Sequence, residues 1–218
     1  IARLVGSEMC IRDSPNTVRH DFYKDKKVDR DLEKKYSKEF VITYVGNTSK
    51  RRGLLTVIDS LKIIQKTIPN IKLLIIGKSS FDQVIKDKIK QNQIEKLVDF
   101  IGWIKESDIP NYLSISELGL SPLHKNIHHD TTYANKVFQY ISFGCPIVSS
   151  NVIAQSELVN KYKIGVIFED NNAFDLSDKI IELHNDKNLY NRLKQNCLDS
   201  IEKLNNSVIS NQLISIYE

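Results

Sequence analysis

The sequence predicts a doubly wound α/β fold, in which a parallel β-sheet is covered by helices on both faces. From residue 40 onward, short apolar runs alternate with longer amphipathic stretches. Several of the short runs are apolar on both faces, as strands buried inside a parallel sheet are. Each step from strand through helix to the next strand is short, which favours the crossover connections of a parallel sheet.

Six short apolar segments are predicted as strands, at residues 40–46, 71–77, 97–102, 117–123, 146–150 and 165–168. The stretches between them are predicted as helices, at residues 54–66, 81–92, 108–115, 134–143 and 154–159. After residue 168 the pattern is helical, and we expect helices at residues 173–184, 189–204 and 208–217. The highly charged run of residues 24–38 is interpreted as a solvated loop or an exposed helix.

The composition is that of an ordinary soluble globular chain, with 41% hydrophobic and 27% charged residues among 218. It supports one hydrophobic core or at most two small ones. No apolar stretch approaches the roughly 18 residues of a membrane span, and no signal-peptide pattern opens the chain. The net charge of +4 is dispersed along the sequence, so it does not indicate a nucleic-acid partner.

The first residues need separate treatment. The segment "RLVGSEMCIRDS" at residues 3–14 resembles a translated sequencing-library adapter, because residues 4–14 can be reverse-translated into that adapter without a forced codon. We therefore interpret residues 1–14 as non-native and exclude them from the fold, with a genuine disordered leader as the alternative. Two cysteines then remain, Cys145 and Cys197, which indicates a reducing cytoplasm rather than a disulfide framework. On this interpretation the start of the natural protein lies upstream of Pro15.

The loop after the first predicted strand, "GNTSKRRGL", is strongly basic. Gly46 allows close backbone approach, and Lys50, Arg51 and Arg52 crowd the start of the next helix, where backbone N–H groups already favour anions. Three neighbouring cations repel one another unless an anion or solvent relieves them. The loop is therefore either an anion site or a solvated basic turn. It is not a dinucleotide fingerprint, because Gly-x-Gly-x-x-Gly is absent.

Two other patterns are weaker. The stretch "IIGKSS" resembles a P-loop, but Lys72 stands where the P-loop needs its first glycine. His124 and His128 have a spacing that would allow zinc binding on a helix, but Pro122 and the strand-like run before it favour a loop. We therefore predict neither a metal site nor a cofactor.

The stretch "TTYANKVFQ" precedes the apolar strand at residues 146–150. On a helix, Ala134, Val137, Phe138 and Ile141 form a core face, while Asn135, Gln139 and Ser142 form another face with Lys136 at its border. Thr131 or Thr132 is expected to cap the first turn of this helix. The helix start and Lys136 would then converge at the mouth of the sheet, as a site for a diphosphate would require. A solvated surface remains the alternative.

Taken in order, these blocks resemble the C-terminal half of GT-B glycosyltransferases of the family-four, retaining type, with its Rossmann-like fold. The segments that carry the resemblance are "PNTVRHDFY", "YVGNTSKRRGL" with its step from Gly46 to Gly53, "VDFIGWIKESDIPNYLSISELGLSPL", "NKVFQYISFGCPIVSS" and "LYNRLKQNCLDSI". The resemblance covers essentially all of the chain after residue 14. It implies a nucleotide-sugar-binding domain at residues 15–204 and a helix at residues 205–218 that packs back toward an N-terminal domain absent from this sequence.

The resemblance also implies the roles of individual residues. Diphosphate binding falls to Gly46, Arg51, Arg52 and Lys136, and binding of the donor sugar or ribose falls to Thr131, Thr132, Asn135 and Gln139. Gly102, Trp103 and Ile104 would lie near the base. Family members carry Glu-x7-Glu around the donor helix, where this sequence has Thr131 and Gln139. Catalytic residues are expected partly in the N-terminal domain and are not assigned here.

The function implied is transfer of a glycosyl group from a nucleotide diphosphate sugar to an acceptor hydroxyl, in the building of surface or extracellular glycans. The acceptor would be a glycan or a lipid-linked sugar, and the isolated chain is expected to be inactive. The complete protein would be cytoplasmic, with peripheral association at the inner face of the membrane. A catalytically inactive sugar-nucleotide-binding or partner domain is the alternative. A GT-B sugar-nucleotide epimerase shares the fold but not the "NKVFQY" block.

Overall fold

The computed structural model describes residues 17–19, 22–23, 29–205 and 207. Its centre is a six-stranded, all-parallel sheet with the strand order β3-β2-β1-β4-β5-β6. The predictions for residues 1–14 and for a helix at residues 208–217 lie outside the described residues. The predicted doubly wound α/β fold is confirmed.

The strands are short, and the four central ones are almost entirely buried, whereas the edge strands β3 and β6 are largely half-buried. They are β1 (Phe40–Val45), β2 (Ile71–Ile76), β3 (Val98–Gly102), β4 (Leu118–Ser121), β5 (Ile147–Ser150) and β6 (Gly165–Phe168). β1 lies at the centre of the sheet, where it pairs with β2 over its whole length and with β4 through Ile42 and Thr43. All six strands coincide with predicted strands to within a few residues.

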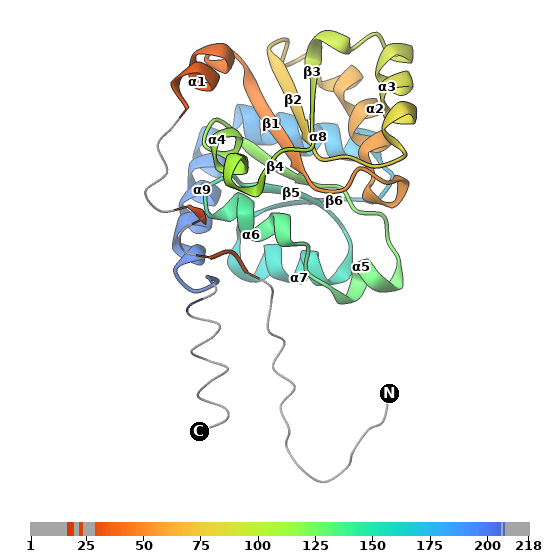
Figure 1. The fold of residues 1–218 in the computed structure, drawn as a ribbon. Coiled ribbons are helices and arrows are strands. Elements are labelled where there is room, and N and C mark those ends of the chain that lie inside the picture. The colour runs from red at the N-terminus through yellow and green to blue at the C-terminus, as the bar shows by residue number, and fades with distance from the viewer. Residues whose placement is uncertain (1–16, 20–21, 24–28, 206, 208–218) are drawn as a thin grey trace, which may run out of the picture.

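Helices cover both faces of the sheet (Figure 1). One face packs against α2 (Leu54–Ile64), α3 (Asp82–Gln91) and α8 (Ala173–Asn185), whose apolar residues form one large core cluster with the strands. The opposite face packs against α4 (Ile109–Leu113), α6 (Asn135–Ile141), α7 (Ile153–Tyr162) and α9 (Lys187–Ile201), around a second cluster. The remaining short elements are α1 (Arg30–Tyr36), η2 (Lys50–Arg52), η3 (Glu95–Leu97), η4 (Glu106–Asp108) and α5 (Ile127–Thr131).

Three details differ from the sequence prediction or resolve it. Residues 127–131 were expected to lie in a loop but form α5, because the Asn126 side chain caps the helix by accepting from the His129 backbone N–H. α7 runs to Tyr162, beyond the predicted end at residue 159, and stops at Lys163 in a left-handed conformation. The charged run that was interpreted as a loop or an exposed helix contains α1, capped by Asp29.

The order of the strands changes at β1. From β1 the chain extends the sheet through β2 and β3 on one side, and then through β4, β5 and β6 on the other. The helices that follow β1 and β2 lie on one face, and those that follow β4 and β5 lie on the other, so the loops after β1 and β4 separate at this point. In open α/β sheets this switch point, at the carboxyl ends of the strands, is where ligands bind.

Candidate functional site at the switch point

A cavity of about 950 Å³ opens at the carboxyl ends of the central strands. Its walls come from the loops that follow β1, β2, β3 and β4, and from the start of α6. Most of the residues expected to bind the donor lie along it, namely Gly46, Arg52, Trp103, Ile104, Thr132, Asn135, Lys136 and Gln139. Arg51, Gly102 and Thr131 do not line it.

The loop after β1 brings Arg52 to the cavity. Gly46 has a φ of 125°, and Gly53 ends the short helix η2 with a φ of 74°. A side chain at Gly53 would collide with the Pro122 carbonyl oxygen, 1.7 Å from the position of its Cβ, so the tight turn requires glycine. Arg52 Nε is buried and has no hydrogen-bond partner among the described residues. Arg51 instead points to the exposed side, and its backbone oxygen accepts from the His124 N–H.

Lys136 is the most enclosed charged side chain of the site. It is only 7% exposed, and its Nζ lies 3.7 Å from the centroid of the Tyr44 ring. On its other side it runs past Gly46, where a Cβ would lie 3.6 Å from Nζ. Within the described part of the chain, Nζ has neither a hydrogen bond nor an ion pair. Burial, and secondly the charge of Arg52, lowers the pKa of Lys136 well below its usual value.

Tyr140 anchors α6, the short helix that carries Lys136. Its hydroxyl donates to the Leu120 carbonyl oxygen at 3.0 Å and accepts from the Val45 N–H at 2.9 Å. It therefore ties α6 to both β1 and β4. Gly119 makes room for the ring, since a Cβ there would lie 2.2 Å from it. Because Lys136 and Tyr140 are one helical turn apart, they lie on the same side of α6.

The predicted helix cap before α6 is wrong. The N-cap residue is Ala134, which makes no side-chain capping bond. The two threonines bond backward to α5 instead, since Thr131 Oγ1 donates to the Ile127 carbonyl oxygen at 2.8 Å and Thr132 Oγ1 to that of His128 at 2.6 Å. α5 occupies residues that were assumed to be free to cap the next helix.

The three residues expected near the base differ in position. Trp103 is 64% exposed, and Lys78 Nζ lies over its ring, 5.6 Å from the centroid. Ile104 lines the cavity beside it. Gly102 does not line the cavity, and its carbonyl oxygen accepts a hydrogen bond from the Gly77 N–H at 2.7 Å.

The sequence analysis did not assign His128 and His129 to this site, although both line the cavity. The His129 ring is buried, its Nδ1 lies 2.7 Å from the His124 carbonyl oxygen, and its Nε2 has no partner among the described residues. Burial lowers the pKa of His129, and Arg52 and Arg51 lower it further, against the raising effect of the bond to His124. Asn126, three residues before His129, was the available signal, because it is a typical helix cap.

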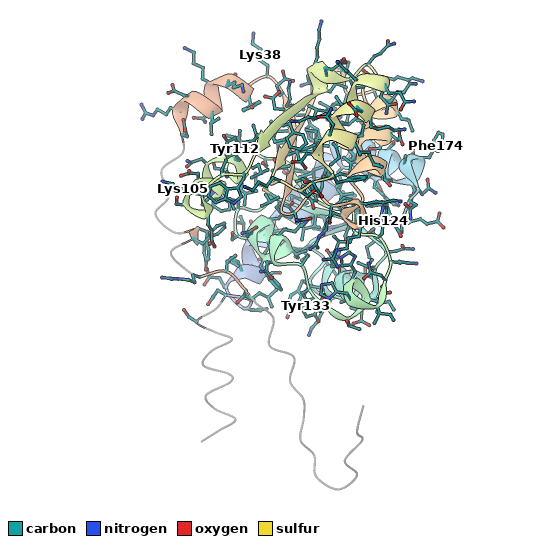
Figure 2. All side chains as sticks on the ribbon, turned by 45° about the vertical axis from the view of Figure 1, so that its right-hand side comes forward. Lys38, Lys105, Tyr112, His124, Tyr133 and Phe174 are labelled. Carbon is teal, nitrogen blue, oxygen red and sulfur yellow. The ribbon has the colours of Figure 1, made fainter. Side chains whose placement is uncertain are left out.

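His124 has a carboxylate partner, Asp170. His124 Nδ1 lies 2.7 Å from Asp170 Oδ1, in a hydrogen bond that joins the loop after β4 to the loop after β6. In the part of the chain that the structure describes, no three histidine, cysteine or carboxylate residues are grouped as metal ligands. Figure 2 shows His124 and Tyr133 on the segment that leads from β4 to α6.

The fold and the cavity together define a doubly wound α/β protein with a basic ligand cavity at its switch point. The sequence model of the family described as "Glycosyl transferases group 1" matches residues 25–198. The chain therefore belongs to this family. The predicted resemblance to the C-terminal part of GT-B glycosyltransferases is confirmed.

Named relatives and solved structures agree with this assignment. The chain is 27% identical over 195 residues to the capsular polysaccharide biosynthesis glycosyltransferase CapM of Staphylococcus aureus. The aligned region covers 85% of this chain and 49% of CapM. Its fold resembles that of Anabaena HepE in complex with UDP, with a TM-score of 0.80, 17% identity and coverage of 93% and 56% of the two chains. It also resembles the C-terminal domain of LpcC, a glycosyl transferase group 1 family protein of Francisella tularensis, with a TM-score of 0.64, 19% identity and coverage of 87% and 93%. The chain thus spans about half the length of CapM and HepE.

Proposed function

We propose that this chain is the donor-binding part of a glycosyltransferase that moves a glycosyl group from a nucleotide diphosphate sugar to an acceptor hydroxyl. One observation supports this above all. In a member of the glycosyl transferases group 1 family, the cavity at the switch point is lined by two basic side chains, the half-buried Arg52 and the buried Lys136, whose Nε and Nζ atoms are buried and have no partner among the described residues. Buried basic groups without a partner are costly, and an anion would relieve that cost.

Arg52 and Lys136 are proposed to bind the diphosphate. As the glycosidic bond breaks, negative charge grows on the leaving diphosphate, and cations fixed in a water-poor site stabilise that charge. Gly46 lets the backbone of the first loop approach the phosphates closely. Arg51 is the weaker candidate, since its side chain lies on the exposed side of the loop.

The remaining wall residues are proposed to bind the nucleoside and the sugar. Asn135, Gln139 and Thr132 offer amide and hydroxyl groups to the sugar or the ribose, and Thr131, which does not line the cavity, is the weaker candidate. Trp103 and Ile104 present an apolar surface to the base, and Gly102 supports that segment. Exposed tryptophan is suited to stacking on an aromatic base.

The acceptor is proposed to bind in an N-terminal domain of the complete protein. The chain spans 49% of CapM, whose name places it in capsular polysaccharide synthesis. We infer that the acceptor is a glycan or a lipid-linked sugar, that the protein works in the cytoplasm at the inner face of the membrane, and that the chain alone transfers nothing. Within the described residues, no helix has the length and apolarity of a bilayer-spanning segment.

A second candidate is a catalytically inactive binding domain of the same family. It is favoured by the neutral side chains of Thr131 and Gln139, which stand where the family pattern has glutamates. A domain of this kind would bind the nucleotide sugar without turnover. Transfer of labelled sugar by the complete protein, lost on Lys136→Ala, would support the enzyme over this alternative.

Titration of the chain with UDP and with GDP tests the proposed site. We expect one of them to bind, and Arg52→Ala to weaken that binding by about 10- to 100-fold, because a charge-assisted hydrogen bond contributes about 1.5–3 kcal/mol. Arg192→Ala is the matched control, since Arg192 is exposed on α9 and does not line the cavity. If neither nucleotide binds, or if both variants bind equally well, the assignment of the cavity is wrong.

A further inference from the structure

Among the described residues, no acidic side chain forms an ion pair with Lys136 that would hold it as an ammonium ion. β1 presents the Tyr44 ring and the backbone of Gly46, and the loop after it presents the cation Arg52. The other titratable groups lining the cavity are Lys78 after β2, Glu106 on η4, His128 and His129 on α5, and Tyr133 before α6. Among them only Glu106 is acidic, and no ion pair joins it to Lys136 within the described residues.

We propose that Lys136 is a neutral amine in the empty site, and that a bound diphosphate brings a proton from solvent to its Nζ, so that donor binding takes up one proton. The proposal deepens the proposed function and rests on it. The step is a simple protonation, in which the lone pair of Nζ accepts a proton released by the buffer. The product is an ammonium ion paired with phosphate oxygens.

The physical basis is the difference between the two states of the site. In the empty site an ammonium would be desolvated, would lie beside the positive charge of Arg52 and would lack a hydrogen-bond acceptor among the described residues, so the neutral form is favoured. A diphosphate supplies acceptor oxygens and negative charge at the same place, which favours the charged form. Face contact with the Tyr44 ring is too weak to replace such a partner.

The proposal has a defined pH dependence. The pKa of Lys136 is lowered in the empty site and rises when the anion binds. Between these two pKa values the complex binds one proton more than the free chain, so affinity falls by about tenfold for each unit of rising pH. Below the pKa of the empty site Lys136 is protonated in both states, and its contribution to the pH dependence vanishes.

Calorimetric titration with UDP and GDP at about pH 8, in HEPES and in Tris, measures proton uptake directly, because the two buffers release their protons with different enthalpies. At this pH the terminal phosphate is ionised, since its ordinary pKa is about 6. We expect the binding heat to differ between buffers by an amount that corresponds to uptake of about one proton. Ionisation of a bound phosphate would give the opposite sign.

Two variants assign the proton. Lys136→Met should weaken nucleotide binding and abolish the buffer dependence. Lys62→Met, at an exposed lysine on α2 that does not line the cavity, should leave both unchanged. Thermal unfolding verifies that each variant is folded. If Lys136→Met does not fold, the proton uptake of the wild-type chain still tests the proposal.

The outcomes separate the two proposals. Nucleotide binding with no proton uptake in the wild-type chain, or uptake that persists in folded Lys136→Met, overturns the inference about Lys136 while the proposed function stands. Absence of binding by both nucleotides overturns the proposed function.

Discussion

At the scale of single residues, glycines set how closely the loops of the cavity approach one another. Gly77 has a φ of 138°, and a Cβ there would lie 1.8 Å from the Gly46 carbonyl oxygen. Gly102 has a φ of 79° but an open position, with nothing within 4 Å of a Cβ. The first glycine is required by both conformation and space, the second by conformation alone.

These two glycines form a matched pair for a stability test. We expect Gly102→Ala to lower the free energy of unfolding by about 1–2 kcal/mol, the cost of a left-handed conformation for an L-residue. Gly77→Ala should cost on the order of 1–3 kcal/mol more, because the backbone of Gly46 must also move. Urea denaturation of both variants measures the difference. Equal losses would show that the contact between the two loops is not tight.

The side chain of Lys136 marks how far residue-level prediction from the sequence can go. The pattern of "NKVFQY" placed Lys136 at the border of a polar face. That placement was equally compatible with a solvated lysine on the surface. Its burial depends on Tyr140, which reaches strands far away in the sequence, and on the missing side chains of Gly46 and Gly119. Such tertiary contacts leave no local signal.

At the scale of elements, helix caps decide which predictions succeed. The strands and long helices follow from apolar periodicity, which is a property of each segment by itself. α5 was missed because it is short and rich in histidine, and the threonines at its end were therefore assigned to α6. The capping role of Asn126 was visible in the sequence, but the bond of Thr132 to the His128 carbonyl was not, since it depends on where α5 ends.

The cap of α8 offers a direct test at this scale. The Asn172 side chain accepts from the backbone N–H groups of Phe174 and Asp175, at 3.1 and 3.0 Å. We expect Asn172→Ala to lower the free energy of unfolding by about 1 kcal/mol. Asn188→Ala, at an exposed position in the first turn of α9, is the control and should change stability by less than about 0.5 kcal/mol. Chemical denaturation measures both. A loss for Asn172→Ala no larger than that of the control would contradict the capping role.

At the scale of the whole molecule, the two core clusters on either side of the sheet contain titratable groups that are neutral when buried. The Cys145 thiol is fully buried, and burial raises its pKa to about 12. Burial likewise raises the pKa of the Tyr140 hydroxyl and of the Cys197 thiol. Each of these groups is easier to ionise in the unfolded chain, so each stabilises the fold only while the unfolded chain keeps its proton.

We therefore expect the free energy of unfolding to fall as the pH rises above about 9, where the thiols of the unfolded chain ionise, and more steeply above about 10, where its tyrosines do. Each group contributes up to about 1.4 kcal/mol per pH unit. The lowered pKa of Lys136 acts in the opposite direction, but it is one group against several. Urea denaturation between pH 8 and pH 11 measures the slope. Cys145→Ala should be less stable at pH 8 yet show a shallower slope, and identical slopes would contradict the assignment.

The change in strand order between β1 and β4 has a consequence for synthesis and folding. Arg52 follows β1 and Lys136 follows β4, so the two basic groups belong to halves of the domain that are made at different times. On a ribosome that builds the chain from its N-terminus, the cavity can close only after α6 has emerged and Tyr140 has docked on the strands. The proposed nucleotide binding would then be a late event, and a nascent chain that binds the proposed ligand would report that its two halves have joined.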